Sequence, residues 1–143
     1  EIMPSLVGSE MCIRDRQEAG HQAGERVYIN AHGTGTPMND SLETQVVKLA
    51  LGEEEAKKAY MSSTKSMTGH MLGAAGAIEA LACLKALNEG ILPPTINLLD
   101  PDPACDLDIV PNEGRQADIK VAISDSLGFG GHNTCLVFQK WEG

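Results

Sequence analysis

The chain has 143 residues, enough for one domain of ordinary size, and 42% of them are hydrophobic. A formal net charge of −9 argues against a nucleic-acid partner, which would need a basic patch. The longest apolar stretch, residues 74–87, is interrupted by Gly76, Glu79 and Lys85 and is too short to span a bilayer, so we expect no membrane partner either.

The four cysteines are Cys12, Cys83, Cys105 and Cys135, and they show neither a Cys-x-x-Cys pair nor the spacing of metal ligands. We therefore predict reduced thiols, no metal site and a cytoplasmic location. None of the four is a good candidate nucleophile. Cys83 falls in the middle of an apolar helix, and Cys105 stands among aspartates that would raise the pKa of its thiol.

The first 26 residues show many charges and no sustained hydrophobic period, so we interpret them as a leader that is poorly ordered or foreign to the domain. The pattern sharpens at Val27, where we place the start of a domain covering residues 27–143. The run VYINA predicts a strand, and HGTGTP after it predicts a glycine turn.

A helix is predicted next, over NDSLETQVVKLAL, and Gly52 is its expected end. Asp40 and Glu43 have the spacing of a capping box at its start. Its apolar face is predicted from helical spacing. The residues on that face are Leu42, Val46, Leu49 and Ala50.

A short strand, AYMSS, and a loop, TKSMTGHMLG, lead into a second helix over residues 73–89 that ends at Gly90. This helix is apolar nearly all round, so we expect it to be buried, with Gly73 and Gly76 allowing close packing. The proline-rich segment after it predicts an extended connector, and LDIVP a short strand. Two strands, KVAISDS and NTCLVFQKW, flank the hairpin LGFGGH, so the element order predicts an α/β fold.

The turn after the first strand is a candidate site, because α/β folds place functional side chains at strand ends. His32 leaves that strand, glycines would let a ligand approach the backbone, and the hydroxyls of Thr34 and Thr36 can donate or accept hydrogen bonds. The alternative is a plain turn with a satisfied histidine. Phosphate binding fits poorly, since no Gly-Lys-Ser/Thr follows.

A second candidate is formed by Lys65, His70 and Glu79, which surround the start of the second helix. A carboxylate in such an apolar helix needs a partner, and Lys65 or a histidine could supply it. Burial and the helix dipole should keep His70 neutral and able to donate one N–H to a developing oxyanion. The alternative is a structural salt bridge under a surface loop.

A third candidate is the turn GFGGHN. Phe129 could act as a gate over an apolar pocket, and its backbone N–H could join an oxyanion hole. The alternative is a tight hairpin between two strands.

Five segments together resemble the C-terminal half of β-ketoacyl-acyl-carrier-protein synthases, most closely the type II fatty-acid elongating enzymes of the thiolase superfamily. They are INAHGTGTP, STKSMTGHMLGAAGAIEA, PPTIN, DLDIVPN and SLGFGGHN, and the resemblance covers residues 27–140. It implies a thiolase-like α/β fold, in which helices sandwich a mixed β-sheet and the glycine-rich helix is buried. The implied reaction is the decarboxylative Claisen condensation of an acyl thioester with malonyl-acyl-carrier-protein in fatty-acid biosynthesis.

The resemblance also implies roles for the candidate residues. His32 and His70 match the two histidines of a Cys-His-His triad, which would donate to the malonyl thioester oxygen. Lys65 matches the lysine that orders the second histidine, and Glu79 matches the buried glutamate of that network.

Substrate contacts and partners follow from the same resemblance. Thr34 and Thr36 match threonines that bind a phosphopantetheine arm, Phe129 matches the gating phenylalanine, and Gly130 beside it is assigned to substrate binding. No cofactor is expected beyond the arm that acyl carrier protein delivers, and the complete enzyme is expected to be a homodimer.

The chain also departs from the family. The half that carries the nucleophilic cysteine is absent, so we predict that the isolated chain does not condense. Asp125 stands where the family usually has Asn, and Leu127 where it usually has Phe. Two alternatives stay open: a polyketide-type ketosynthase or its chain-length-factor partner, and a noncatalytic fragment that only pairs with a synthase-like chain.

Overall fold

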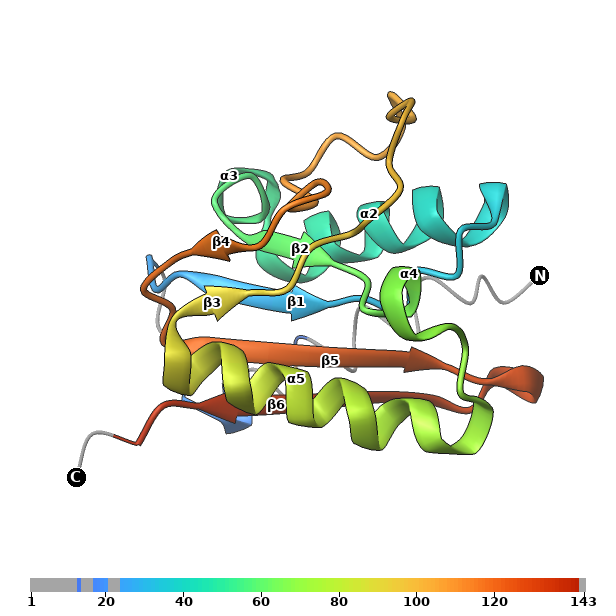
Figure 1. The fold of residues 1–143 in the computed structure, drawn as a ribbon. Helices are drawn as coiled ribbons and strands as arrows, with labels where there is room; N and C mark the ends of the chain where they lie inside the picture. Colours follow the sequence, from blue (N-terminus) through green and yellow to red (C-terminus); the bar gives the residue numbers. More distant parts are fainter. Residues whose placement is uncertain (1–12, 14–16, 21–23, 142–143) are drawn as a thin grey trace.

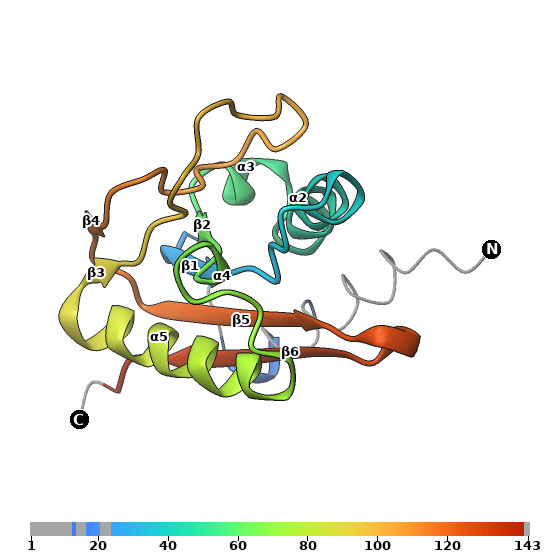
Figure 2. The ribbon, with the colours of Figure 1, turned by 45° about the vertical axis from the view of Figure 1, so that its right-hand side comes forward.

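The computed structural model describes residues 13, 17–20 and 24–141, which form a mixed sheet between two helices (Figures 1 and 2). The strand order is β2-β1-β5-β6. β1 (Val27–Asn30) pairs in parallel with β2 (Tyr60–Ser62) and with β5 (Val121–Leu127), and β6 (Asn133–Gln139) is antiparallel to β5. All four residues of β1 are buried, as expected for a parallel strand covered on both faces.

The helices and minor elements lie around this sheet. They are α2 (Pro37–Leu51), α3 (Glu53–Ala56), α4 (Lys65–Thr68), the 3-10 turns η1 (Leu72–Ala74) and η2 (Phe129–Gly131), α5 (Ala75–Glu89), and a two-stranded ribbon of β3 (Ile91–Leu92) and β4 (Arg115–Gln116). The predicted loop between β2 and α5 therefore contains two short helical turns. The predicted α/β fold, with helices on both faces of a mixed sheet, is confirmed.

Alternate side chains of the strands supply two cores. Ile29, Val121 and Ile123 pack with Val47 of α2 on one face of the sheet. On the other face, strand residues including Tyr28 and Ala122 pack with three residues of α5, which are Cys83, Ala86 and Leu87. The period of two along β1 and β5 thus assigns each strand residue either to the α2 side or to the α5 side.

The predicted apolar face of α2 is only partly correct. Leu42 and Leu49 are exposed, and the helix instead buries Glu43, Thr44, Val47 and Ala50. The capping box is wrong as well. Thr36 is the N-cap without a side-chain hydrogen bond, and the helix opens on a proline, whose missing N–H suits that position. The predicted end of the helix at Gly52 is confirmed, since its N–H bonds to the carbonyl of Lys48.

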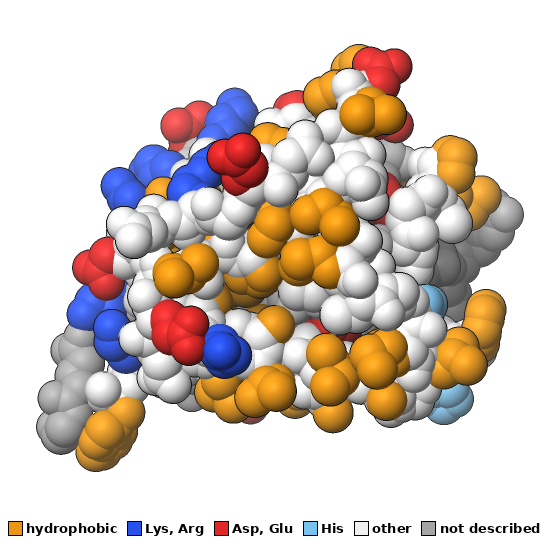
Figure 3. All heavy atoms as spheres, viewed as in Figure 1, with side chains coloured by type: hydrophobic (Ala, Val, Ile, Leu, Met, Phe, Trp, Pro, Cys, Tyr) orange, Lys and Arg blue, Asp and Glu red, His pale blue; other side chains and the backbone are white. Residues whose placement is uncertain are grey.

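α5 is buried on one side only, which corrects the expectation of a helix buried all round. Glu79, Cys83 and Leu87 face the sheet. The opposite side carries exposed apolar residues, seen as a row of hydrophobic atoms along α5 in Figure 3. These residues are Leu72 before the helix, then Ile78, Leu81 and Leu84. Close packing at the glycines is not seen among the described residues, since a Cβ on Gly73 would meet nothing within 4 Å and one on Gly76 only Ser126 Oγ at 3.7 Å.

The segment LDIVP is not a strand. Leu107 and Val110 are buried, but the segment pairs only through single bridges, from Asp108 to Tyr60 and from Pro111 to Thr95. Short extended pieces that lack a full ladder partner do not form a strand, whatever their β propensity.

The predicted leader, residues 1–26, lies mostly outside the described residues. Of the part that is described, Ile13 packs against the core on the α2 side of the sheet. Its assignment as a leader stays a prediction. In the described part of the chain, no helix has both the length and the apolar composition needed to cross a bilayer.

Candidate active site

The candidate residues gather where parallel strands end, because the carboxyl ends of such strands meet at one edge of a sheet. His32 follows β1 two residues after its end, and Lys65 follows β2 at the start of α4. The carboxyl end of β5 contributes Ser126 and Leu127 to the same edge. The topology thus brings residues of all three sequence candidates to one place from distant parts of the chain, because His32, His70 and Gly128 line the same cavity.

His32 and His70 lie edge to face. Their ring centroids are 5.5 Å apart and their planes meet at 85°. Both rings line a cavity of about 280 Å³, together with Ser126, Leu127 and a histidine that sequence reasoning did not single out, His132.

His32 is buried, with 8% of its surface exposed, and its Nδ1 has no hydrogen-bond partner among the described residues. Burial lowers the pKa of its imidazole, and the positive charge of Lys65 and the neighbouring His70 lower it further. His32 is therefore neutral at pH 7 and has one N–H to donate.

His70 is exposed, so its expected burial is wrong. It also precedes α5 by the whole of η1, which places it away from the N-terminus of that helix. Instead, the backbone N–H of Leu72 donates to Nδ1 of His70 at 3.1 Å. Because Nδ1 accepts this bond, the proton of the neutral ring lies on Nε2, where it is available as a donor.

Lys65 and Glu79 form a buried ion pair, in which Nζ of Lys65 donates to Oε1 of Glu79. Their side chains are 5% and 3% exposed. The hydroxyl of Ser126 donates to the other carboxylate oxygen at 3.4 Å. Of the two partners expected for Glu79, the structure shows the lysine rather than a histidine. The positive charge of Lys65 also lowers the pKa of the nearby His32.

Glu43 is a site residue that sequence reasoning missed, since it was taken for a helix cap. Its Oε1 accepts the backbone N–H of His32 at 2.5 Å, and its Oε2 accepts the N–H of Gly33 at 2.9 Å. Asn39 donates to Oε2 as well, at 3.1 Å. The carboxylate therefore holds the turn that presents His32.

Gly33 makes this turn possible. It has a positive φ of 38°, and a Cβ placed on it would lie 2.5 Å from Cβ of Ser63. Ser63 in turn donates its hydroxyl to the carbonyl of Gly33 at 2.8 Å. The close approach of the β1 and β2 ends thus requires a residue without a side chain.

The two threonines line a larger cavity of about 680 Å³ that also contacts Gly33 and His70. Their hydroxyls lie 3.3 Å apart. Phe129, in contrast, is 99% exposed and lines neither of these two cavities. Gly130 follows it with a positive φ of 78°, in a tight turn where the N–H of Gly128 bonds to the carbonyl of His132.

This mixed sheet, with His32 just after the end of β1 and His70 beside it, defines a thiolase-like domain. The sequence model of the β-ketoacyl synthase C-terminal domain matches residues 2–99. The chain therefore belongs to the β-ketoacyl synthase family, which is a family of enzymes.

Curated relatives agree with this assignment. The chain is 52% identical over 131 residues to 3-oxoacyl-[acyl-carrier-protein] synthase 2 of Vibrio harveyi, which covers 92% of this chain and 31% of the relative. It is 56% identical over 115 residues to the protein of the same name from Synechocystis sp., covering 80% of this chain and 27% of the relative. The chain is also 50% identical over 135 residues to the Staphylococcus aureus protein of the same name, and this match covers 94% of this chain and 32% of the relative. The chain thus spans about a third of the length of these relatives.

Solved structures share the fold. A β-ketoacyl synthase from Burkholderia phymatum superposes with a TM-score of 0.87 at 34% identity, over 96% of this chain and 33% of that one. A type II polyketide ketosynthase, solved with its acyl-carrier protein and bound to the hexaketide, superposes with a TM-score of 0.88 at 38% identity. The match covers 94% of this chain and 33% of that one.

Proposed function

We propose that this chain supplies the two histidines of a 3-oxoacyl-acyl-carrier-protein synthase of the fatty-acid elongating type. The observation that carries the proposal is the pair of His32 and His70, 5.5 Å apart, on one cavity. A neutral His32 and the Nε2 proton of His70 give two N–H donors that can converge on one oxygen.

Two converging donors suit a thioester carbonyl that becomes an enolate. When malonyl-acyl-carrier-protein loses CO₂, the electron pair of the broken C–C bond passes into the enolate, whose oxygen both histidines would stabilise. The enolate carbon then attacks an acyl thioester on a cysteine, a new C–C bond forms, and the cysteine thiolate leaves. That cysteine would come from the part of the synthase that this chain does not contain.

Further substrate contacts belong to the same proposal. Thr34 and Thr36 would bind the phosphopantetheine arm in the larger cavity, so that the chain needs no cofactor of its own. The backbone N–H of Phe129, next to Gly130, would complete an oxyanion hole. The partner would be acyl carrier protein, in a homodimeric enzyme of the cytoplasm.

A second candidate is condensation in polyketide synthesis. The favouring observation is that a type II polyketide ketosynthase, solved with its acyl-carrier protein, superposes on this chain with a TM-score of 0.88. The 50–56% identity to synthases named for 3-oxoacyl-acyl-carrier-protein formation supports the fatty-acid reaction over this one.

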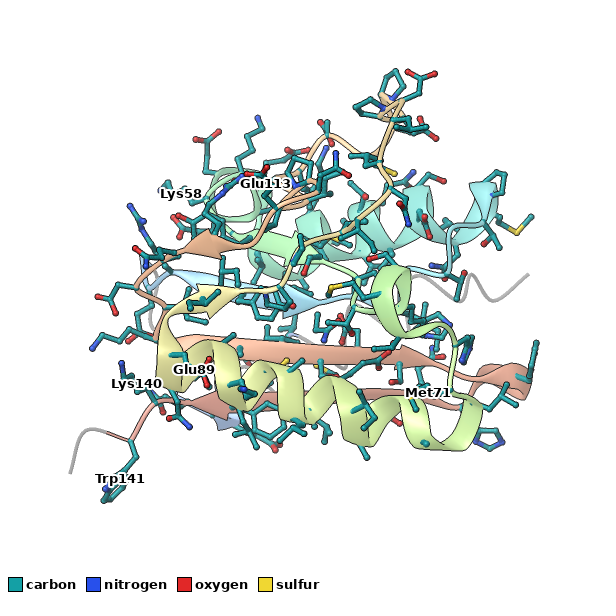
Figure 4. All side chains as sticks on the ribbon, viewed as in Figure 1. Lys58, Met71, Glu89, Glu113, Lys140 and Trp141 are labelled. Atoms are coloured by element: carbon teal, nitrogen blue, oxygen red, sulfur yellow. The ribbon has the colours of Figure 1, made fainter. Side chains whose placement is uncertain are left out.

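The test uses a chimera in which this chain replaces the matching third of the Staphylococcus aureus synthase. We expect the chimera to decarboxylate malonyl-acyl-carrier-protein and to elongate an acyl group, and His32→Ala and His70→Ala each to abolish decarboxylation. Lys58→Ala is the control, since Figure 4 shows Lys58 at the end of the molecule opposite Met71, the neighbour of His70. A chimera that decarboxylates equally well without His32 would refute the proposal. The 143-residue chain alone should not elongate.

A further inference from the structure

Asp125 is a buried carboxyl group on the central strand β5, and 6% of its surface is exposed. Along β5, Val121 and Ile123 point to the core shared with α2. Because side chains alternate along a strand, Asp125 continues this series and faces α2 as well. It lies near the end of β5 at which the active-site residues gather.

Glu43 is the group on α2 that meets this end of β5. It precedes Val47 by one helical turn on the buried face, and 3% of its surface is exposed. The negative charge of Asp125 raises the pKa of the Glu43 carboxyl group. The two buried carboxyl groups therefore approach each other from neighbouring layers.

The other polar groups around Glu43 come from α2 and from the end of β1. Asn39 donates its amide both to Glu43 and to Asp40, at 3.1 Å each. The turn after β1 contributes the backbone N–H groups of His32 and Gly33, both of which donate to Glu43. It also carries the imidazole of His32. Lys65 supplies a positive charge that lowers the pKa of the His32 imidazole in this turn. Among these groups, Asp125 is the one that disfavours an ionised Glu43 by like charge.

We propose that Asp125 is a positioning residue, whose buried carboxyl group on β5 faces Glu43 and sets how firmly Glu43 holds the His32 turn through the backbone N–H groups of His32 and Gly33. An ionised carboxylate accepts from both amides, whereas a protonated carboxyl has one oxygen that is a poorer acceptor. Protonation of Glu43 therefore releases part of the anchor of His32. The structure thus assigns to Asp125 an effect on a histidine that it reaches only through Glu43.

The charges support this assignment. Burial raises the pKa of Glu43 to about 7, and the negative charge of Asp125 acts in the same direction. The hydrogen bonds from Gly33, His32 and Asn39 oppose it, since they favour the ionised form. An asparagine at position 125 would remove the like charge and leave those hydrogen bonds in place. For its catalytic meaning the inference rests on the proposed function, but its test needs no substrate.

The experiment follows the backbone amide proton of Gly33 by NMR in the full 143-residue chain, from about pH 5 to pH 9, where a perturbed carboxyl titrates. We expect this resonance to titrate with a midpoint near 7 in the unmodified chain. In Asp125→Asn the midpoint should fall by about half a pH unit or more. In Glu43→Gln the transition with a midpoint near 7 should vanish. Asp118→Asn is the matched control, because it removes the same charge from an exposed position and should leave the midpoint unchanged.

Two results would overturn the inference. One is a Gly33 amide that does not titrate in the unmodified chain, and the other is an unchanged midpoint in Asp125→Asn. If that variant does not fold, the side-chain carboxyl ¹³C signals of Glu43 and Asp125 in the unmodified chain decide instead. If the titration curves of the two carboxyl groups depend on each other, they support the inference. If each group titrates independently of the other, they refute it. A chain that titrates as expected while the chimera fails to decarboxylate would refute the proposed function and leave this inference standing.

Discussion

Lys65 and Glu79 form an ion pair that is almost wholly withdrawn from water, and their α-carbons belong to different helices, α4 and α5. A charge buried without its partner is far more costly than a buried pair, because nothing replaces the lost hydration. We therefore expect Lys65→Met alone to destabilise the chain by about 3–5 kcal/mol, measured by urea unfolding. Lys65→Met combined with Glu79→Leu should be much less destabilising than the single change. The exposed pair Lys85–Glu89 is the control, and its loss should have little effect.

Glu43 makes the stability of the chain depend on pH. Its pKa rises from an ordinary value of 4.5 to about 7 in the folded protein, mainly through burial. Between these values the folded state binds more protons than the unfolded state, so the stability that Glu43 contributes falls as pH rises. The shift corresponds to roughly 3 kcal/mol. We expect urea unfolding of the chain and of Glu43→Gln to show this difference between about pH 4 and pH 8. A difference that is constant with pH would contradict it.

His32 should titrate below the ordinary histidine value of 6.5, because burial and Lys65 both lower its pKa. As pH falls, the unfolded chain takes up the proton at about 6.5, before the folded chain does. The stability that neutral His32 contributes is therefore lost as pH falls from 6.5 through the lower pKa of the folded state. The ring proton signals of His32 measure the midpoint by NMR. Lys65→Met should raise it, since a positive neighbour is lost and Glu79 is left as a negative one. Lys85→Met removes an exposed lysine and should leave it unchanged.

Gly33 should tolerate no side chain. Gly33→Ala brings a Cβ to 2.5 Å from Cβ of Ser63, where backbone and side chain have no room to separate. Gly35→Ala is the matched comparison, because Gly35 also has a positive φ, of 74°, but open space around it. We expect Gly35→Ala to lose only the roughly 1–2 kcal/mol of left-handed strain, and Gly33→Ala to lose more and to shift the His32 signals. Equal losses in the two variants would argue against the close approach of the strands.

The two sides of α5 should respond differently to substitution. Leu87 is 3% exposed and Leu81 is 54% exposed. Leu87→Ala should therefore cost about 2–5 kcal/mol in urea unfolding of the chain. Leu81→Ala, a chemically identical change on the same helix, should cost well under half as much. Similar losses at both positions would mean that the exposed side is covered in solution.

Much of the fold could be predicted from local patterns. The runs that became β1, β5 and β6 are β-rich and bounded by glycine, and both long helices end at the expected glycines, Gly52 and Gly90. Periodicity does not show what covers each side of a helix, which is why α2 buries Glu43 rather than Leu42. The same limit hid the exposed side of α5.

The candidate site was predicted in part. That Glu79 needs a partner, either Lys65 or a histidine, followed from the cost of burying a charge, and the structure shows that the partner is Lys65. The anchoring of His32 by Glu43, and the bond from Leu72 to His70, depend on backbone N–H groups that carry no sequence signal. Residues that position a site through the backbone are therefore the ones that sequence reasoning misses.

The pairing of β1 with β5 also affects how the chain folds. Val27 lies opposite Val121, so the central ladder joins two strands that are separated along the chain by β2 and by both long helices, α2 and α5. Contacts of such long sequence separation form slowly, because the entropy of closing the long loop between the strands is lost before their contacts can stabilise the chain. The cavity shared by His32 and Ser126 can exist only after that ladder closes. On a ribosome, the two histidines would thus be synthesised well before they can meet the end of β5, and the site is among the last parts of the molecule to assemble.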